Sequence, residues 1–440
     1  MAKTHHTVID NADFLDLQEI KRIQAARWIT QGNYVHQCSP FYQRHCPQLS
    51  AITTLDALAD LPFTDKEMLR EDQRQHPPFG SYLSVSGTRI VRMHRTSGTT
   101  GTAMNLALTE DDAVMTAMVG ARAQKAAGLG PRNRVIHCLN YQLWMGGYTD
   151  HSTLEATGAM VIPYGVGNTR GLIETIQNLQ IDAISCTSSY PSVLAQTLEA
   201  DFPMITPRDL GLKLGLFGGE PGLDDPAFRK KLEDIWGFDA RNSNYGVTDV
   251  LCNFAGQSTL SNDLHLVALD VLYPELIDPV STGAKQWKEG EVGELVLTHL
   301  CKQAQPLIRF RTGDIIEITG TDRAKCRRSA PRFRVIGRSD EMITIRGINV
   351  FPTMVAETIN KISGLSGEYR ITLDHPPPYQ SLPIEVELSR EHSSPNALVA
   401  EIQNCIKRYI GVHADVILRG SNTLPRTQGK TRRVIRTHKK

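Results

Sequence analysis

A segment rich in glycine and hydroxyl side chains, residues 96–101 (TSGTTG), has the composition of a phosphate-binding loop. Glycines allow positive φ angles and close backbone approach, so successive amides can point into one concavity. The hydroxyls of Ser97, Thr99 and Thr100 add donors suited to phosphate oxygens. However, no Lys follows the second glycine, as it would in the P-loop pattern G-x-x-x-x-G-K-[ST]. The segment is therefore either a phosphate-binding loop of another kind or an ordinary loop between strands.

Three later clusters carry groups that a nucleotide site needs. Residues 244–249 (NYGVTD) combine an aromatic ring that can stack on a base with Asp249, a hard oxygen ligand that suits Mg²⁺ beside phosphates. In residues 311–314 (RTGD) a carboxylate follows a glycine turn and could accept hydrogen bonds from ribose hydroxyls. Residues 424–430 (LPRTQGK) present one lysine on a turn that contains glycine. Taken singly, the three clusters also fit a buried aromatic, a surface turn and a solvated basic tail.

From about residue 90 onward, short apolar runs alternate with amphipathic helices. Strands are expected at residues 135–139, 159–163, 183–186 and 213–217, and helices at 110–127, 172–179, 191–200 and 226–235. Thr109 and Asp112 predict a capping box for the first of these helices. This alternation predicts an α/β fold in which a mostly parallel sheet is covered by helices. Upstream, the spacing predicts a helix over 13–30 and a Pro-rich, irregular stretch over 38–80 with a short helix near 55–61.

Beyond residue 260 the helical periodicity fades, which predicts a β-rich subdomain. Its strands are expected at 294–298, 314–318 and 333–336. Residues 337–340 (GRSD) then form a polar break with turn chemistry. After it come a hairpin (342–345 and 349–351), a helix from 353, a helix at 396–409, and strands at 369–373, 384–388 and 415–418. We therefore predict a large N-terminal domain, 1–339, and a small α+β C-terminal domain, 340–440.

Composition and charge exclude several classes of function. The 440 residues are 40% hydrophobic and 22% charged, and Lys+Arg 48 against Asp+Glu 47 gives +1, so no global charge recruits nucleic acid or an anionic membrane. No window approaches 18 apolar residues, which argues against a membrane span. The eight cysteines include no CxxC pair, and the first residues lack the apolar core of a signal peptide. We expect a cytoplasmic protein with reduced cysteines and neither nucleic acid nor a membrane as partner.

The order of the clusters is more specific than any one of them. Residues 96–101, 219–221, 245–249, 311–314, 337–340 and 429–430 run in the order seen in adenylate-forming enzymes, which are the acyl-CoA synthetases, peptide-synthetase adenylation domains and luciferases. The sequence most closely resembles the phenylacetate–CoA ligase branch, in segments such as VIPYGVGNTR, LGLFGGEPG, PLIRFRTGD, GRSDEMITIRGINVFPT and LPRTQGKTRR. The resemblance covers roughly residues 90–437.

This resemblance implies a reaction in which ATP activates a carboxylate to an acyl-adenylate that is then passed to CoA. It assigns ATP and AMP binding to Ser97, Gly98, Thr99, Thr100, Gly101, Gly219, Glu220, Tyr245, Gly246, Asp314 and Arg338. It assigns catalysis to Lys430, Thr248 and Asp249, with Asp249 also holding the Mg²⁺ that arrives with ATP. It makes Asp340 the hinge about which the small domain turns between the two steps.

Three departures from the family pattern bear on these assignments. Thr102 stands where a Lys is often found, and Asp249 stands where a Glu is usual, one methylene shorter. Some members of the branch bind zinc through Cys and His, and the matching places here read Gln257, Ser258, His265, Ala324 and Cys326. Because a closed structural zinc site needs four nitrogen or sulfur ligands, we expect no zinc.

In that branch, the segment corresponding to residues 140–147 (NYQLWMGG) lines the aryl site. Tyr141 and Trp144 offer flat apolar walls, and Gly147 and Gly218 are assigned to the same acyl pocket. The less favoured alternative is that Trp144 is simply a core residue. Asp150 and His151 follow closely, and either one would recognise an amino or hydroxyl substituent if it faced the pocket.

The leading hypothesis is an AMP-forming ligase that joins an aromatic acid, such as a benzoate, aminobenzoate or phenylacetate, to CoA. One alternative passes the same adenylate to an amine or to a carrier-protein thiol. Another is a non-catalytic nucleotide- or acyl-binding relative, although Lys430, Asp314, Arg338 and Asp340 together argue against it. A stand-alone NTPase is disfavoured because the P-loop lysine is missing. The resemblance alone suggests a homodimer.

Overall fold

The structure is a computed structural model that describes residue 9 and residues 11–96, 103–220, 222–323, 325–389, 395–425 and 433–438. Several predicted site residues therefore lie outside the described residues, namely Ser97, Gly98, Thr99, Thr100, Gly101 and Lys430. Pro221, Thr102 and Ala324 lie outside them as well.

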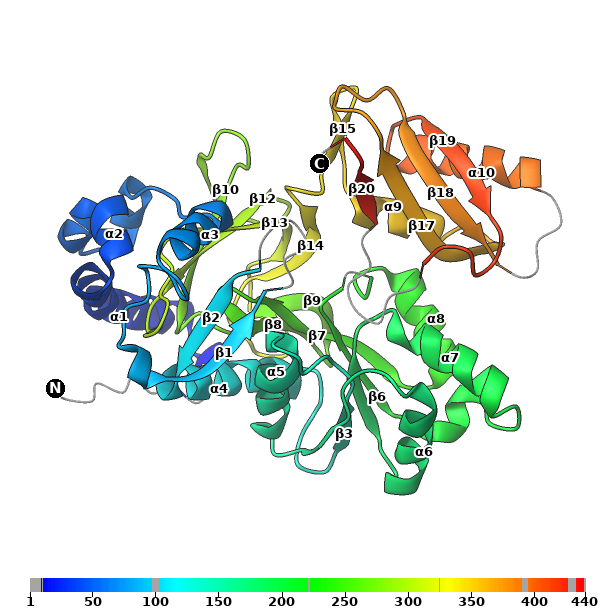
Figure 1. Ribbon diagram of the computed structural model, residues 1–440, viewed down its shortest axis with the longest axis horizontal. Helices are drawn as coiled ribbons and strands as arrows, with labels where there is room; N and C mark the ends of the chain where they lie inside the picture. Colours follow the sequence, from blue (N-terminus) through cyan, green and yellow to red (C-terminus); the bar gives the residue numbers. More distant parts are fainter. Residues whose placement is uncertain are drawn as a thin grey trace.

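Twelve strands form one mixed sheet in the order β11-β10-β12-β13-β14-β9-β8-β7-β6-β5-β3-β4 (Figure 1). Neighbouring strands from β4 to β7 pair in parallel, and the remaining pairs are antiparallel. The parallel half comprises β3 (Arg134–His137), β4 (Met160–Pro163), β5 (Ala183–Cys186), β6 (Leu214–Gly218) and β7 (Asp239–Val247). The antiparallel half comprises β8 (Leu251–Ser258), β9 (Ser261–Leu266), β10 (Leu272–Ile277), β11 (Ala284–Lys285), β12 (Val292–His299), β13 (Phe310–Gly320) and β14 (Arg332–Arg338).

Helices cover both faces of the parallel half. Along β3, Val135 belongs to the same core cluster as Leu154 of α5, whereas its neighbour Ile136 belongs to the cluster of Leu172 of α6 and Trp236 of α8. Successive residues of a strand point to opposite faces, so this division follows from strand geometry. The helices are α4 (Glu110–Ala126), α5 (Met145–Glu155), α6 (Thr169–Leu179), α7 (Tyr190–Asp201) and α8 (Pro226–Trp236). The predicted α/β architecture with helix-covered parallel strands is confirmed.

The N-terminal residues build helices onto the β-rich half of the sheet. Trp28 and Tyr42 are fully buried in the core cluster that also contains Phe254 and Phe333. The helices are α1 (Leu17–Cys38), α2 (Pro40–His45) and α3 (Lys66–Gln75), and a separate hairpin joins β1 (Ile90–Arg95) to β2 (Asn105–Thr109). Short 3₁₀ turns occupy Ala12–Phe14, Pro47–Ala51, Asp56–Asp60, Gly87–Arg89 and Pro207–Leu210.

The predicted element boundaries hold in part. The capping box of α4 is confirmed, since the Asp112 amide donates to Thr109 Oγ1 at 3.1 Å and the Thr109 amide donates to Asp112 Oδ2 at 3.1 Å. The first helix begins later than predicted, at Leu17, and runs on to Cys38. The expectation of an irregular stretch over 38–80 is wrong at α3, and α5 was not predicted as a helix.

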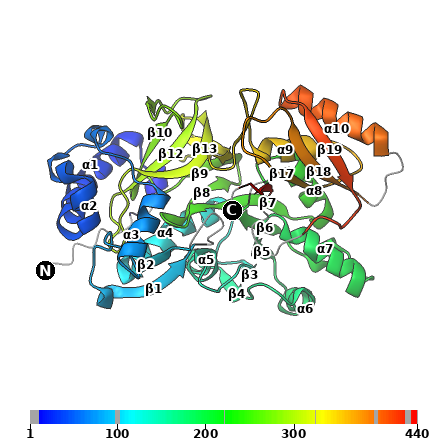
Figure 2. The same cartoon turned by 45° about the horizontal axis from the view of Figure 1, so that its top comes forward.

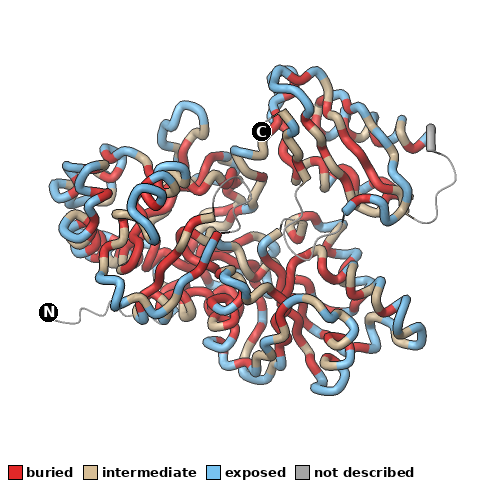
Figure 3. The backbone as a smooth tube through the Cα atoms, viewed as in Figure 1, coloured by how far each residue is buried: buried red, intermediate tan, exposed pale blue. Residues whose placement is uncertain are grey.

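A smaller four-stranded sheet, in the order β19-β18-β17-β20, follows the large one in the chain. Its strands are β17 (Leu365–Leu373), β18 (Leu382–Leu388), β19 (Ala414–Arg419) and β20 (Val434–Arg436), accompanied by α9 (Pro352–Ile359), α10 (Pro395–Tyr409) and the hairpin of β15 (Ile343–Ile345) and β16 (Ile348–Val350). These elements have a core cluster of their own, which includes Ile371 and Ile402. Figures 2 and 3 show this small unit beside the large sheet, with its own buried strands. The hairpin expected at 342–351 is confirmed.

Within the described parts of the chain, no helix combines the length and the apolar character needed to cross a bilayer.

Candidate active site

The carboxylate of Asp314 joins three strands of the large sheet. Tyr245 of β7 donates its hydroxyl to Asp314 Oδ2 at 2.7 Å, and Arg338 of β14 donates Nη1 to Asp314 Oδ1 at 2.7 Å. Burial and the neighbouring Asp314 carboxylate hold the pKa of Tyr245 well above its usual range, so this phenol remains a donor. The predicted residues Tyr245, Asp314 and Arg338 thus form one cluster.

Arg338 extends this cluster toward the small unit. Its Nε donates to Asp340 Oδ1 at 2.9 Å, and the amide of Ser339 donates to the Gly313 carbonyl at 2.7 Å. One guanidinium therefore connects Asp314, inside the large sheet, with Asp340, the predicted hinge.

The Tyr245 ring is held edge-on by two other aromatic side chains. Its centroid lies 5.2 Å from that of Phe254 and 5.4 Å from that of Phe333, with T-shaped geometry in both pairs. Such edge-to-face contacts fix a ring plane. Gly246, the next residue, has no room for a side chain, since a Cβ there would lie 1.9 Å from the Cys252 carbonyl oxygen. The half-buried Tyr245 is therefore rigidly placed at the carboxyl end of β7.

Asp249 is buried and paired with a residue that the sequence did not reveal. Lys66, the first residue of α3, donates Nζ to Asp249 Oδ2 at 2.8 Å. The other oxygen, Oδ1, is buried and has no hydrogen-bond partner among the described residues. An orphan carboxylate oxygen of this kind suits Mg²⁺ that reaches the site with phosphates. The described residues contain no group of three or more His, Cys, Asp or Glu side chains that could hold a metal, so ATP would have to provide further ligands.

Two buried donors fix the turn that follows Asp249. The Val250 carbonyl accepts from Lys302 Nζ at 3.0 Å and lies 3.1 Å from His299 Nε2. His299 Nδ1 accepts from the Leu307 amide at 2.9 Å, so the proton of this imidazole is on Nε2. Burial lowers the pKa of both Lys302 and His299. Thr248 and Asp249 are thereby anchored through the main chain next to them.

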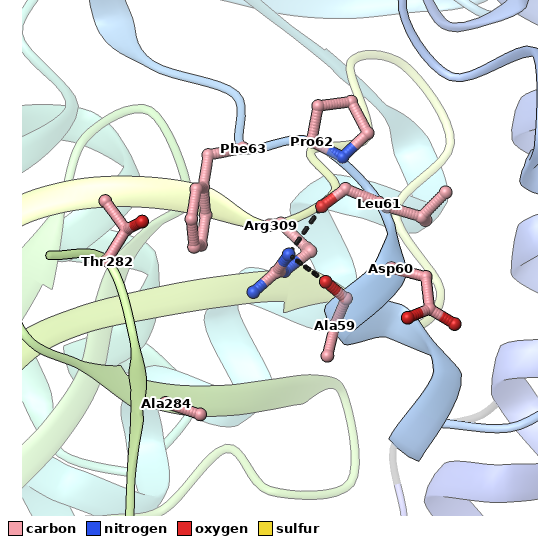
Figure 4. Close-up of a pocket in the computed structure, with 8 residues that line it drawn as sticks. All are labelled: Ala59, Asp60, Leu61, Pro62, Phe63, Thr282, Ala284 and Arg309. Atoms are coloured by element: carbon pink, nitrogen blue, oxygen red, sulfur yellow. Dashed lines mark hydrogen bonds between the residues drawn. The ribbon is translucent and has the colours of Figure 1, made fainter.

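A second arginine anchors the segment that leads into α3. Figure 4 shows Arg309 at a surface pocket of about 450 Å³, where it donates to the carbonyls of Ala59 and Leu61. The same guanidinium makes a salt bridge of 2.9 Å with Glu275 and lies 4.0 Å from the centroid of the Phe63 ring. Because its contacts are with the protein itself, we assign Arg309 to holding residues 59–63 and hence α3 in place.

The predicted acyl residues lie at the carboxyl ends of β3 and β6. A Cβ on Gly219 would stand 3.6 Å from the indole of Trp144, which is half-buried and so not simply a core residue. The Tyr141 hydroxyl lies 2.9 Å from His151 Nδ1, and His151 Nε2 lies 3.2 Å from Glu155. In open α/β sheets, ligands bind at the carboxyl ends of parallel strands. Tyr141 and Trp144 therefore stand where a substrate would be expected.

Gly147 and Gly218 allow close packing of the protein itself. A Cβ on Gly147 would lie 2.3 Å from the Asn140 carbonyl oxygen, and one on Gly218 would lie 2.5 Å from the Asn244 carbonyl oxygen. Both positions therefore require glycine, because the neighbouring main chain leaves no room for a Cβ atom. Glu220 accepts from the Ser189 amide at 3.2 Å, which ties the loop after β6 to the start of α7.

Asp150 lies beneath this region, fully buried on α5. Its Oδ1 accepts from Thr153 Oγ1 at 3.1 Å and its Oδ2 from Asn244 Nδ2 at 2.5 Å. Burial raises the pKa of Asp150 to about 7, although the two hydrogen bonds oppose the rise. Neither α5 nor this contact was visible in the sequence.

At the places where some relatives bind zinc, the structure brings His265 and Cys326 together, with Sγ 3.6 Å from Nε2. A side-chain pair does not make a four-ligand site. Since Ala324 lies outside the described residues, the expected absence of zinc stays a prediction.

Comparison with known proteins places this arrangement in a family. The chain is 34% identical over 430 residues to the phenylacetate-coenzyme A ligase of Pseudomonas putida, covering 96% of this chain and 93% of that protein. It is 31% identical over 448 residues to the phenylacetate-coenzyme A ligase of Escherichia coli strain K12, covering 98% of each.

The chain belongs to the phenylacetate-coenzyme A ligase family. Residues 347–438 also match the family model described as the AMP-binding enzyme C-terminal domain. This match spans α9, α10 and the small sheet, in agreement with the resemblance seen in the sequence.

Solved structures of a similar ligase in two states match this chain to different degrees. The crystal structure of 2-hydroxyisobutyryl-CoA ligase in the postadenylation state, with 2-HIB-AMP, matches with a TM-score of 0.88 at 27% identity over 100% of this chain and 95% of that one. The same ligase in the thioesterification state, with 2-HIB-AMP and CoA, matches with a TM-score of only 0.70 at 29% identity over 99% and 95% of the chains. The structure of this member of the phenylacetate-coenzyme A ligase family therefore resembles the postadenylation structure more closely than the thioesterification structure.

Two side-chain contacts join the small unit to helices of the large one. Asn360, after α9, donates to Asp225 Oδ2 at 3.0 Å, while the other oxygen of Asp225 caps α8 through the Ala227 amide at 2.9 Å. Gln196 of α7 donates to Asn422 at 3.3 Å. Figure 1 shows α7 and α8 facing the small sheet.

The ion pair between Lys66 and Asp249 should contribute measurably to stability. Lys66→Met leaves a buried carboxylate without its partner, and Asp249→Asn removes that charge, so the double variant should be more stable than the sum of the single effects predicts. We expect a coupling of about 1–2 kcal/mol, measured by urea unfolding at pH 7, because the lysine is partly exposed. The exposed pair Glu19–Arg22 is the matched control and should show almost no coupling. Strictly additive effects at Lys66 and Asp249 would show that the pair contributes nothing.

The raised pKa of Asp150 should make stability depend on pH. Between its ordinary pKa of 3.8 and about 7, the folded protein keeps a proton that the unfolded chain has released, so stability falls as pH rises through this window. Asp150→Asn does not titrate. The melting temperature of Asp150→Asn minus that of the wild type should therefore increase from pH 5 to pH 8. A constant difference across this range would show that Asp150 is ionised throughout.

Proposed function

We propose that this chain activates an aromatic carboxylic acid with ATP and transfers it to CoA, giving an aryl-CoA thioester. The observation that carries the proposal is the cluster of Tyr245, Asp314 and Arg338 at the carboxyl edge of the sheet, in a chain related over nearly its whole length to phenylacetate-coenzyme A ligases. In the first step, a carboxylate oxygen attacks the α-phosphorus of ATP and pyrophosphate leaves. In the second step, the CoA thiol attacks the acyl carbon and AMP leaves.

The described geometry supports specific roles in the nucleotide site. The Asp314 carboxylate would accept the ribose hydroxyls, with Arg338 beside it, while Gly219, Glu220, Tyr245 and Gly246 would line the adenine slot. The orphan oxygen of Asp249, together with Thr248, would hold Mg²⁺, which neutralises phosphate charge when bound. Lys66 would keep the Asp249 carboxylate oriented.

The two segments outside the described residues, together with Asp340, complete the proposed mechanism. The amides and hydroxyls of Ser97, Gly98, Thr99, Thr100 and Gly101 would hold the β- and γ-phosphates. Lys430 would offset the charge that builds on the α-phosphate, which is the electrostatic stabilisation that dominates phosphoryl-type chemistry. Asp340 would act as the hinge between the proposed domains 1–339 and 340–440, so that the small domain turns from adenylation to thioester formation.

Location and assembly are part of the same proposal. We place the enzyme in the cytoplasm, where CoA and ATP are available, without bound zinc, and as a homodimer by analogy with its branch. A carrier-protein thiol or an amine in place of CoA is the competing acceptor.

The proposal is tested by pyrophosphate release with ATP and Mg²⁺ across benzoates, aminobenzoates, phenylacetates and short aliphatic acids, including 2-hydroxyisobutyrate, each with and without CoA. We expect repeated turnover with an aryl acid only when CoA is present. A slow burst that CoA fails to accelerate would point to the competing acceptor. Turnover confined to aliphatic acids would overturn the aromatic assignment, and silence with every acid would overturn the ligase.

Lys430→Ala should separate the two half-reactions. We expect pyrophosphate release to fall by at least about 100-fold, as for other groups that stabilise developing charge, while thioester formation from supplied acyl-adenylate and CoA is retained. Comparable losses in both half-reactions would contradict the proposed role. Lys439→Ala, in the same basic tail, is the matched control and should leave both rates near the wild-type values.

Asp314→Asn should impair nucleotide binding more than acid binding. The amide keeps the size of the side chain but loses the charge that the ribose hydroxyls and Arg338 require, so the KM for ATP should rise by about 10-fold or more while the KM for the acid changes little. Steady-state kinetics with each substrate varied in turn measures both constants. A larger change in the KM for the acid would move Asp314 out of the nucleotide site.

A further inference from the structure

The Asn244 side chain stands between the proposed nucleotide and acyl residues. It belongs to β7, directly before Tyr245, and pairs in register with Gly218 of β6. A Cβ on Gly218 would lie 2.6 Å from the Asn244 Cβ, so this side chain lies directly against the end of β6. The next residue, Gly219, faces the Trp144 indole. Asn244 therefore adjoins the residues that would contact the acid.

Asp150 fixes the orientation of this amide. Its carboxyl group accepts a hydrogen bond from Asn244 Nδ2 at 2.5 Å, and its other oxygen is occupied by Thr153 at 3.1 Å. Because Nδ2 is the end of the Asn244 amide that faces Asp150, its carbonyl oxygen, Oδ1, points elsewhere. Asn244 makes no other side-chain hydrogen bond within the described residues, and it is half-buried.

Burying the Asp150–Asn244 pair costs free energy, which indicates that the pair has a function. Asp150 has no solvent exposure, and burying a carboxyl group in place of an apolar side chain costs free energy even when it is hydrogen-bonded. The neighbouring polar groups are already engaged, because the Tyr141 hydroxyl pairs with His151 and His151 pairs with Glu155. Within the described residues, Asn244 Oδ1 is an acceptor for which no side-chain partner is present.

We infer that the acid taken by this enzyme carries a hydroxyl or amino group, and that Asn244, oriented by Asp150, accepts a hydrogen bond from it. Asn244 is then a specificity-determining residue, and Asp150 is a positioning residue behind it. This inference rests on the proposed function and narrows its substrate class, since an unsubstituted phenylacetate or benzoate would leave the acceptor unpaired. A site built to bind a polar group discriminates against the analogue that lacks it.

The test compares acids in matched pairs by pyrophosphate release with ATP and Mg²⁺. The pairs are phenylacetate against hydroxy- and aminophenylacetates, and benzoate against hydroxy- and aminobenzoates. We expect kcat/KM to be about 10- to 100-fold higher for a substituted acid than for its parent. Asn244→Leu should lower this ratio to near one or below, mainly by loss of activity on the substituted acid.

Variants of Asp150 separate positioning from folding. Asp150→Asn can still accept from Asn244 and should keep the preference, whereas Asp150→Leu cannot and should lose much of it. Asn242→Leu, on the same strand two residues earlier, is the matched control and should leave the ratio between paired acids unchanged.

The outcomes of this test separate failure of the inference about Asn244 from failure of the proposed ligase function. Turnover of parent and substituted acids at equal rates, or an unchanged ratio in Asn244→Leu, would overturn the inference and leave the ligase standing. Silence with every acid would overturn both.

Discussion

The position of one carboxylate, that of Asp314, determines how the rest of the site is arranged. Both of its oxygens are engaged, one by Tyr245 from β7 and one by Arg338 from β14, while its own strand is β13. A buried carboxylate needs such donors, because an ionised group taken out of water without partners is strongly unfavourable. Meeting this need brings together strands from the parallel and antiparallel halves of the sheet. The aromatic ring, the acceptor for a sugar and the start of the linker to the small unit then lie side by side.

The sequence predicted the parallel half of the sheet well because its strands are short apolar runs between amphipathic helices. It failed where local composition opposes the structure. Helix α5 contains Gly146, Gly147 and several Thr and Ser residues, all weak helix formers, and it is held by packing against the sheet and α4. For α3 a readable start existed, since Asp65 caps the helix by accepting from the Met68 amide, but the Pro-rich surroundings suggested irregular structure.

The site was predictable as a set of motifs and not as a set of contacts. Tyr245, Asp314 and Arg338 each lie in a segment with turn or strand chemistry, and the order of those segments led to the family. The pairing of Lys66 with Asp249 joins residues 183 positions apart, and that of Asp150 with Asn244 joins residues 94 apart. No local pattern encodes which distant side chain a buried carboxylate will contact. For the same reason the sequence left the direction of Asp150 open, and the fold had to supply it.

The close backbone contacts of the glycines limit how this enzyme can be redesigned. Acyl pockets are commonly made narrower by enlarging a small residue on their wall. Here a Cβ atom at Gly147 or Gly218 would lie within 2.5 Å of a main-chain oxygen. The main chain could not move away to make room without breaking hydrogen bonds of the helix or strand to which the glycine belongs. Laboratory evolution toward other acids should therefore find its useful changes among side chains that end near the site, such as Trp144 and Asn244, and should find Gly147 and Gly218 closed to variation.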